Sequence, residues 1–109
     1  MLQQINKDNF ETTLKNNDVV LIDFYADWCG PCKALHPTLE QLASEFDQKA
    51  VIAKVNVDQN SELSSAFGVR SIPALFYFKN GELVGKQVGL QSQTAIAQQL
   101  NQLVAEPAA

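Results

Sequence analysis

The sequence predicts an α/β fold in which a central, mixed five-stranded sheet carries helices on both faces. Runs of apolar or alternating residues, typical of strands, are interleaved with segments whose apolar residues recur at helical spacing, in the order β-α-β-α-β-α-β-β-α. The early strands are separated by helices, which predicts parallel crossovers. The last two strands are joined by Asn80-Gly81, which predicts an antiparallel hairpin.

The first two elements are short. Residues 3–6 form a candidate strand, and residues 8–16 are expected to be helical because their apolar residues share one face. Asp8 or Asn6 is expected to cap this helix, with Glu11 three residues after Asp8 in the spacing of a capping box.

The next two elements give the strongest signals in the chain. Residues 19–25 are almost continuously apolar, which is typical of a central strand covered on both faces. A long helix is expected from Cys29 or Pro31 to Asp47, and Pro37 is expected to kink it because proline removes one amide donor. Its apolar stripe consists of Leu35, Leu39, Leu42, Ala43 and Phe46.

The remaining elements follow at short intervals. Residues 51–57 alternate as an inner strand does, and residues 61–67 form a short helix that stops at Gly68. Residues 74–79 and 82–88 are the two strands of the hairpin. Gly89 breaks the second of these, a last helix is expected from Gln91, and residues 106–109 are expected to fray.

Composition limits the possible functions. The chain has 109 residues, 46% of them hydrophobic, so residues 1–109 are expected to form a single folded domain, and we expect a monomer. Eight basic residues against 12 acidic ones give a net charge of −4, which argues against nucleic acid or an anionic membrane as a partner. No export signal or membrane span is visible in the sequence, so we expect a cytoplasmic protein.

The only two cysteines lie in Trp28-Cys29-Gly30-Pro31-Cys32, directly after the apolar strand. As half of a zinc site, the pair lacks further ligands, since the chain has one histidine and no other cysteine. As a structural staple, it would close a ring too small to stabilise the fold much. As a redox pair, the two sulfurs can bond when oxidised and attack a foreign disulfide when reduced, and we favour this interpretation.

A helix that starts at the motif gives the two thiols different tasks. Unpaired amides and the positive end of the helix dipole stabilise a thiolate at Cys29, the form that acts as nucleophile. Cys32 lies one turn deeper and is expected to be less exposed, which suits it to resolve a mixed disulfide. Gly30 permits close approach of a substrate, and Pro31 fits the first helical turn. No charged residue lies between the cysteines to favour the reduced form further, which indicates a reductant.

These residues resemble the thioredoxin family. The resemblance rests on the Trp28–Cys32 motif, Asp23-Phe24, Lys54, Ile72-Pro73 and Gly89, in order over about residues 6–103. It implies the thioredoxin fold and a general protein-disulfide reductase, with Cys29 as nucleophile and Cys32 as resolving thiol. It also implies regeneration by a thioredoxin reductase that draws on NADPH. The chain has no Gly-x-Gly-x-x-Gly fingerprint, so we expect no cofactor and no metal of its own.

The resemblance also assigns supporting roles. Asp23 is the one charge within the apolar strand; burial is expected to raise its pKa, and the implied role is proton acceptor for Cys32. Lys54 is expected on the neighbouring strand, paired with Asp23. The Ile72-Pro73 bond is implied to be cis and to face the cysteines. An apolar docking surface for disulfide substrates is expected from Trp28, Gly30, Pro31, Val57, Ile72, Pro73, Val88 and Gly89.

Two polar residues are interpreted as surface side chains, and two other residues depart from the family pattern. His36 and Arg70 are interpreted as solvated surface side chains. Tyr25 stands where the family commonly has Trp, and Ser71 where it commonly has Gly, which is expected to narrow the substrate groove slightly. A binding module that does not need its thiols, or an oxidase or isomerase of exported proteins, are the alternatives to a reductase.

Overall fold

Five strands form one sheet in the order β1-β3-β2-β4-β5 in the computed structural model, which describes residues 2–107. The strands are β1 (Gln3–Gln4), β2 (Val19–Tyr25), β3 (Val51–Asn56), β4 (Ala74–Lys79) and β5 (Glu82–Val88). The helices are α1 (Phe10–Asn16), α2 (Gly30–Glu45), α3 (Ser61–Ala66) and α4 (Gln93–Ala105). The predicted element order and the mixed sheet are therefore confirmed.

Strand β2 lies at the centre of the sheet. It pairs in parallel with β3 and antiparallel with β4, while β3 pairs in parallel with β1 and β4 pairs antiparallel with β5. Six of the seven residues of β2 are buried, as expected for a strand with neighbours on both edges and helices on both faces. The carboxyl end of β2 leads directly into the loop before α2.

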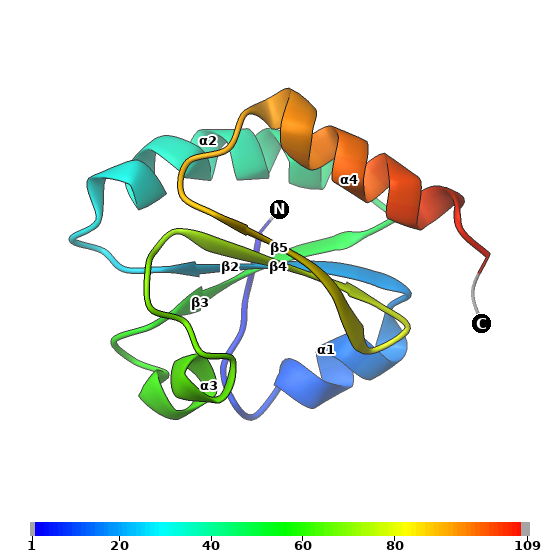
Figure 1. Ribbon diagram of the computed structural model, residues 1–109. Helices are drawn as coiled ribbons and strands as arrows, with labels where there is room; N and C mark the ends of the chain where they lie inside the picture. Colours follow the sequence, from blue (N-terminus) through cyan, green and yellow to red (C-terminus); the bar gives the residue numbers. More distant parts are fainter. Residues whose placement is uncertain (1, 108–109) are drawn as a thin grey trace.

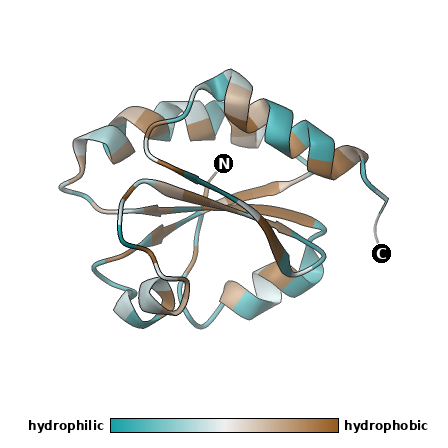
Figure 2. Ribbon diagram, in the orientation of Figure 1, coloured by the Kyte–Doolittle hydropathy of each residue, from teal (hydrophilic) through white to brown (hydrophobic). Residues whose placement is uncertain are grey.

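The sheet separates two hydrophobic layers. Helices α2 and α4 cover one face, and α1 and α3 cover the other (Figure 1). Apolar residues concentrate on the strands and on the inward sides of the helices (Figure 2). The α2 and α4 side is held by fully buried leucines from both helices, among them Leu35, Leu39 and Leu100. The other side contains an aromatic cluster in which Phe67 meets Phe24 and Phe76.

The start of the chain differs from the prediction. Strand β1 is only Gln3–Gln4, and α1 begins at Phe10 after Asn9, which makes no side-chain cap. Asn6 instead accepts hydrogen bonds through Oδ1 from the backbone N–H groups of Asp8 and Asn9. This local turn satisfies the donors before the helix. The expected capping by Asp8 or Asn6 is therefore wrong: the N-cap is Asn9, and Asn6 stabilises the turn before the helix.

Helix α2 runs from Gly30 to Glu45 without a break, although Pro37 lies inside it. A proline inside a helix removes one backbone N–H donor, which is the reason for the kink expected there. The leucines on the buried side anchor the turns before and after Pro37, so packing maintains the helix across it. The helix ends two residues before the expected Asp47.

The carboxyl-terminal hairpin and helix follow the sequence closely. Asn80 and Gly81 have φ values of 53° and 82°, as a two-residue turn of the predicted kind requires. Helix α4 begins at Gln93, two residues later than expected, because Ser92 caps it by accepting from the Ala95 N–H at 3.1 Å. Of the tail predicted to fray, residues 106–107 follow α4, and residues 108–109 lie outside the described residues.

Leu39→Ala tests the role of the α2 contact. Leu39 is fully buried, so we expect a loss of about 2–5 kcal/mol in the free energy of unfolding. Leu90→Ala is the matched control, since Leu90 is 58% exposed and its removal leaves no cavity. Urea unfolding of both variants measures the difference. Equal losses would contradict the assignment of Leu39 to the core.

Candidate functional site

The two cysteines lie at the start of α2 and form a disulfide. Cys29 is the N-cap residue, and the backbone N–H of Cys32 donates to Sγ of Cys29 at 3.2 Å. The Cα atoms are 5.2 Å apart, within the ordinary range for a disulfide. Sγ of Cys29 therefore occupies the position of an anion at a helix N-terminus, with an amide donor directed at it.

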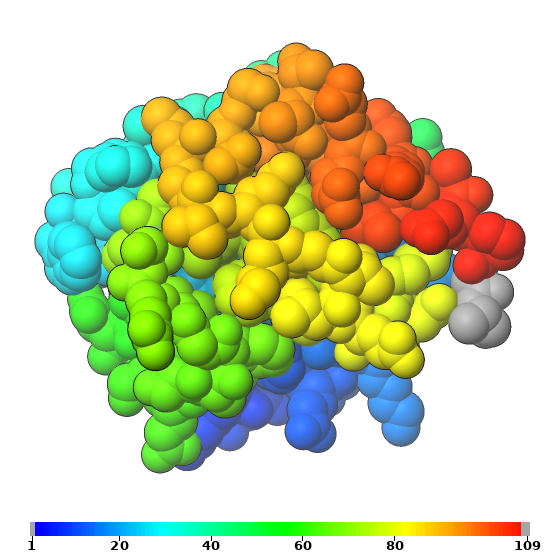
Figure 3. All heavy atoms as spheres, viewed as in Figure 1, coloured from blue at the N-terminus to red at the C-terminus, as the bar shows by residue number. Residues whose placement is uncertain are grey.

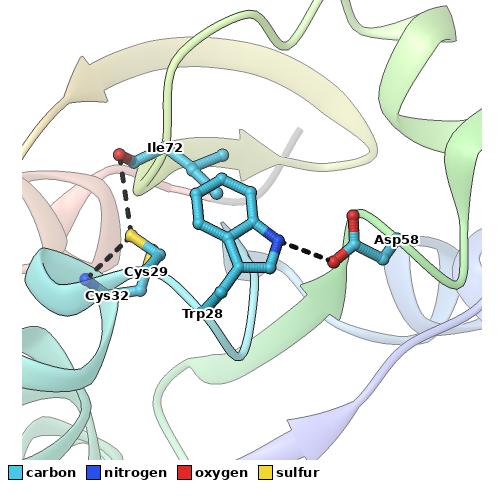
Figure 4. Close-up of a disulfide and its surroundings, with 5 residues drawn as sticks. All are labelled: Trp28, Cys29, Cys32, Asp58 and Ile72. Carbon is cyan, nitrogen blue, oxygen red and sulfur yellow. Dashed lines mark hydrogen bonds between the residues drawn. A yellow bond between two sulfur atoms is a disulfide. The ribbon is translucent and has the colours of Figure 1, made fainter.

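The surroundings of the two sulfurs differ more than their exposure does. Cys29 is 5% exposed and Cys32 is 4%, so the expected difference in exposure is not found. Sγ of Cys29 lies 3.9 Å from the carbonyl oxygen of Ile72, on the side where Trp28 projects (Figure 4). Cys32 instead lines a pocket that also contains Asp23. Cys29 therefore lies beside the Ile72 backbone, whereas Cys32 shares a pocket with the buried carboxylate.

Asp23 is a buried carboxylate in the centre of the sheet. It is 3% exposed, and its Oδ1 has no hydrogen-bond partner among the described residues. Because successive residues of a strand alternate between faces, Asp23 lies on the same face as Leu21, beneath α2. Burial raises the pKa of Asp23 from its ordinary value of 3.8 to about 7, while the charge of Lys54 acts in the opposite direction.

Lys54 is adjacent to Asp23 but is not bonded to it. The two residues are partners in the β2–β3 register. Within residues 2–107 no salt bridge joins them, and the Nζ of Lys54 lies over the ring of Tyr25, 5.3 Å from its centroid. The expected direct pairing is therefore wrong. The ammonium group of Lys54 makes a cation–π contact with Tyr25 instead. Its positive charge lowers the pKa of Asp23 without a direct bond.

A pocket of about 160 Å³ connects these groups to the surface. Cys32, Asp23 and Lys54 line it. Lys33 and His36 of α2 also line it. The His36 side chain is 45% exposed, and its Nε2 lies 3.9 Å from Oε2 of Glu40. Both observations agree with a solvated histidine on the helix surface. The pocket gives water a route to Asp23, whose free oxygen requires such a partner.

Trp28 is an exposed large side chain of the site, with 70% of its surface accessible to solvent. Its Nε1 donates to Oδ2 of Asp58 at 2.9 Å (Figure 4). Asn56, which is buried at the end of β3, accepts through Oδ1 from the Asp58 N–H at 2.9 Å and so holds this loop. We did not predict Asp58 or Asn56 from the sequence. The carboxyl ends of the parallel strands β2 and β3 lie side by side, so polar residues that follow β3 could have been expected near the cysteines.

The Ile72–Pro73 peptide bond is cis, as the resemblance implies. Pro73 is buried, and its carbonyl oxygen accepts from the N–H of Gly89 at 2.8 Å, which joins the two loops beside the cysteines. Gly89 has φ of 89°, a conformation that favours glycine. Val88 beside it is 57% exposed. Around the disulfide, Gly30 and Pro31 are also exposed, and Val57 and Ile72 are half-buried.

Other features of the described residues do not suggest a second reaction centre. A larger depression, about 520 Å³, lies at the amino ends of β2 and β3, at the opposite end of these strands from the cysteines. Within residues 2–107, no cluster of side chains has the composition of a metal site. None of the helices found there has both the length and the apolar character needed to cross a membrane.

Comparisons with known proteins agree with this geometry. A family model described as Thioredoxin matches residues 1–102. A thioredoxin of Haemophilus influenzae is 48% identical over 99 residues, which cover 90% of this chain and 92% of that protein. A thioredoxin of Rickettsia prowazekii is 34% identical over 105 residues, covering 95% and 100%. A solved mutant thioredoxin from Halobacterium salinarum superimposes with a TM-score of 0.90 at 42% identity, covering 96% and 92%.

Asp23→Asn tests the energetic effect of the buried carboxylate. The folded protein keeps the Asp23 proton up to about pH 7, whereas the ordinary pKa is 3.8. Stability is therefore lost as the pH rises between these values, by about 4 kcal/mol in all. The asparagine variant cannot ionise, so we expect it to be more stable than the parent above pH 7, with a difference that shrinks towards pH 4.

Urea unfolding of the oxidised proteins at several pH values measures this effect. Asp47→Asn is the control, because Asp47 is exposed and the same change should leave the pH dependence intact. A pH-independent difference between parent and Asp23→Asn would rule out a raised pKa at this position.

Proposed function

The chain belongs to the thioredoxin family, and we propose that Cys29 attacks substrate disulfides and Cys32 resolves the intermediate. The protein is a disulfide oxidoreductase that acts by dithiol–disulfide exchange. The observation that carries the division of roles is the Cys32 N–H directed at Sγ of Cys29 at the start of α2. An amide donor at that place stabilises a thiolate on Cys29 once the disulfide is reduced.

The reaction proceeds in two exchanges. The Cys29 thiolate attacks one sulfur of the substrate disulfide, which forms a mixed disulfide and expels the other substrate sulfur as a thiolate that takes up a proton. Cys32 then loses its proton and attacks Sγ of Cys29, which expels the second substrate thiolate. Two electrons have passed to the substrate, and the protein is left as the Cys29–Cys32 disulfide, the state in the present structure.

Asp23 is proposed to accept the proton of Cys32 through water in their common pocket. Two features support this role: the two residues line one pocket, and burial raises the pKa of Asp23 to about 7, so that it exchanges protons near neutral pH. Lys54 favours the ionised carboxylate through its charge. The base is therefore available when Cys32 must react.

Substrates are proposed to dock on the apolar surface that surrounds Cys29. Trp28 and Val88 are largely exposed there, and large exposed side chains of this kind indicate a binding surface. The Ile72 backbone, whose carbonyl lies 3.9 Å from Sγ of Cys29, is offered to an extended substrate segment as in strand addition. Apolar and main-chain contacts carry little sequence information, so the range of protein substrates is broad.

We further propose that a thioredoxin reductase using NADPH returns the disulfide to the dithiol. The family membership supports such a partner, and this chain needs no bound cofactor for the exchange itself. We propose that residues 1–109 act as one domain and as a monomer in the cytoplasm, in electron transport and thiol homeostasis.

Replacement of each cysteine by serine tests the order of attack. Cys29→Ser is expected to abolish the catalysed reduction of insulin, both with dithiothreitol and with NADPH plus thioredoxin reductase, because the thiol that attacks the substrate is lost. Cys32→Ser is expected to accumulate a covalent complex with substrate through Cys29, since nothing resolves it. Mass spectrometry of the trapped species measures this. Full activity of Cys29→Ser, or trapping through Cys32 instead, would contradict the proposed order.

Asp23→Asn is expected to slow the resolving step at pH 7 by about tenfold or more, because the general base is lost. In the parent, the rate should rise with pH through about 7 as Asp23 ionises, and the variant should lack this inflection. Stopped-flow measurement of release from a preformed mixed disulfide at pH 5.5–9 gives both profiles. Identical profiles would remove Asp23 from the mechanism.

A further inference from the structure

A second surface pocket, about 190 Å³ in volume, lies between the loop that precedes β4 and the outer strand β5. Its apolar floor includes Ala74, Phe76 and Val88, which share one face of the hairpin because Ala74 pairs with Val88 and Phe76 pairs with Lys86. Arg70 and Lys86 contribute the charges. The loop and β5 adjoin each other on the face shown in Figure 3, green-yellow beside yellow.

The charge of this pocket is opposite to that of the protein. The chain as a whole carries −4, yet none of the described residues that line the pocket is acidic. Among residues 2–107, Arg70 has no hydrogen-bond or salt-bridge partner and is exposed. The Nζ of Lys86 lies 5.4 Å from the centroid of the Phe76 ring, with no acidic partner. Two cations without counter-charges beside an apolar floor suit a carboxylate on a short aliphatic stem.

The pocket adjoins the place where a substrate must lie. Ser71 and Val88 line it, and Ser71 is followed directly by Ile72, whose carbonyl is 3.9 Å from Sγ of Cys29. Arg70 is two residues before Ile72, or about 7 Å along the chain. An extended substrate advances by about 3.3 Å per residue. A side chain roughly two to four residues from the attacked cysteine therefore reaches the two cations.

We propose that this pocket is a specificity subsite for an Asp or Glu side chain of a disulfide substrate, two to four residues from the cysteine that Cys29 attacks. Arg70 and Lys86 bind its carboxylate, and Phe76 and Val88 contact its methylene groups. The inference deepens the proposed function and rests on it. It also revises the interpretation of Arg70 as a plain surface charge.

Single-turnover kinetics with matched peptides tests the subsite. Each peptide carries one cysteine as a mixed disulfide with 2-nitro-5-thiobenzoate, so attack on the peptide sulfur releases a coloured thiolate. Peptides differ only in Glu, Gln or Lys placed two, three or four residues from the cysteine, on either side. At one of these positions the reduced protein is expected to react with the Glu peptide about two- to fivefold faster than with the Gln peptide, and slowest with Lys.

Charge variants of the protein assign the preference to the pocket. In Arg70→Gln/Lys86→Gln the ratio of Glu to Gln rates is expected to fall to about one, and in Arg70→Glu/Lys86→Glu the Lys peptide should become the fastest. The control Lys15→Gln/Lys49→Gln also removes two positive charges, but at positions that precede β2 and β3. It should keep the parental ratio of Glu to Gln rates. Circular dichroism and thermal unfolding confirm that each variant is folded, and the single variant Lys86→Gln should show an intermediate ratio.

The outcomes separate the subsite from the reductase mechanism. Equal rates for the three peptides at every position would overturn the subsite while leaving exchange by Cys29 intact. A Glu preference that is retained in Arg70→Gln/Lys86→Gln, or lost equally in the control, would attribute it to the overall field and also overturn the proposal. Colour release by Cys29→Ser at the parental rate would instead refute the proposed nucleophile. Raising the salt concentration should reduce a genuine preference, since exposed ion pairs are screened.

Discussion

The position of β2 between two partner strands is the constraint on which the site depends. Neighbours on both edges and helices on both faces exclude water from nearly the whole strand, including Asp23 near its carboxyl end. The same end leads into the loop that begins α2, where Cys29 caps the helix. One strand therefore places a buried acid beneath the first turn of a helix, and the thiols are brought to that acid.

Two opposing electrostatic environments meet there. The start of α2, with the Cys32 amide directed at Sγ of Cys29, favours a negative charge on that sulfur. The interior around Asp23 disfavours a negative charge and raises the pKa of the carboxyl group to about 7. A base with this affinity for protons can both take a proton from a thiol and return it to water near neutral pH. Burial costs stability at Asp23, and in the proposed mechanism the raised pKa supplies the proton chemistry of the exchange.

The outer side of the site combines two kinds of recognition. In the proposed docking mode, the apolar surface around Trp28 and the Ile72 backbone accept many extended segments, because neither reads a particular sequence. The charges beside this apolar surface differ in sign. Asp58 accepts a hydrogen bond from the indole of Trp28. Arg70 and Lys86 line the pocket next to Ser71 and have no acidic partner among the described residues. A chain with a net charge of −4 thus carries two cations in one pocket, which we propose lies along the path of the substrate.

The sequence alone determined the element order, the hairpin at Asn80-Gly81 and the redox pair, because hydrophobic period, turn residues and cysteine spacing are all local properties of the chain. It also singled out Asp23, since a charge inside an apolar strand is visible without neighbours. Only the tertiary structure decided that Lys54 lies over Tyr25 instead of pairing with Asp23, that the exposure of the two cysteines is nearly equal, and that Arg70 and Lys86 line one pocket. These features depend on competition among side chains from different elements, and no local pattern records which partner prevails.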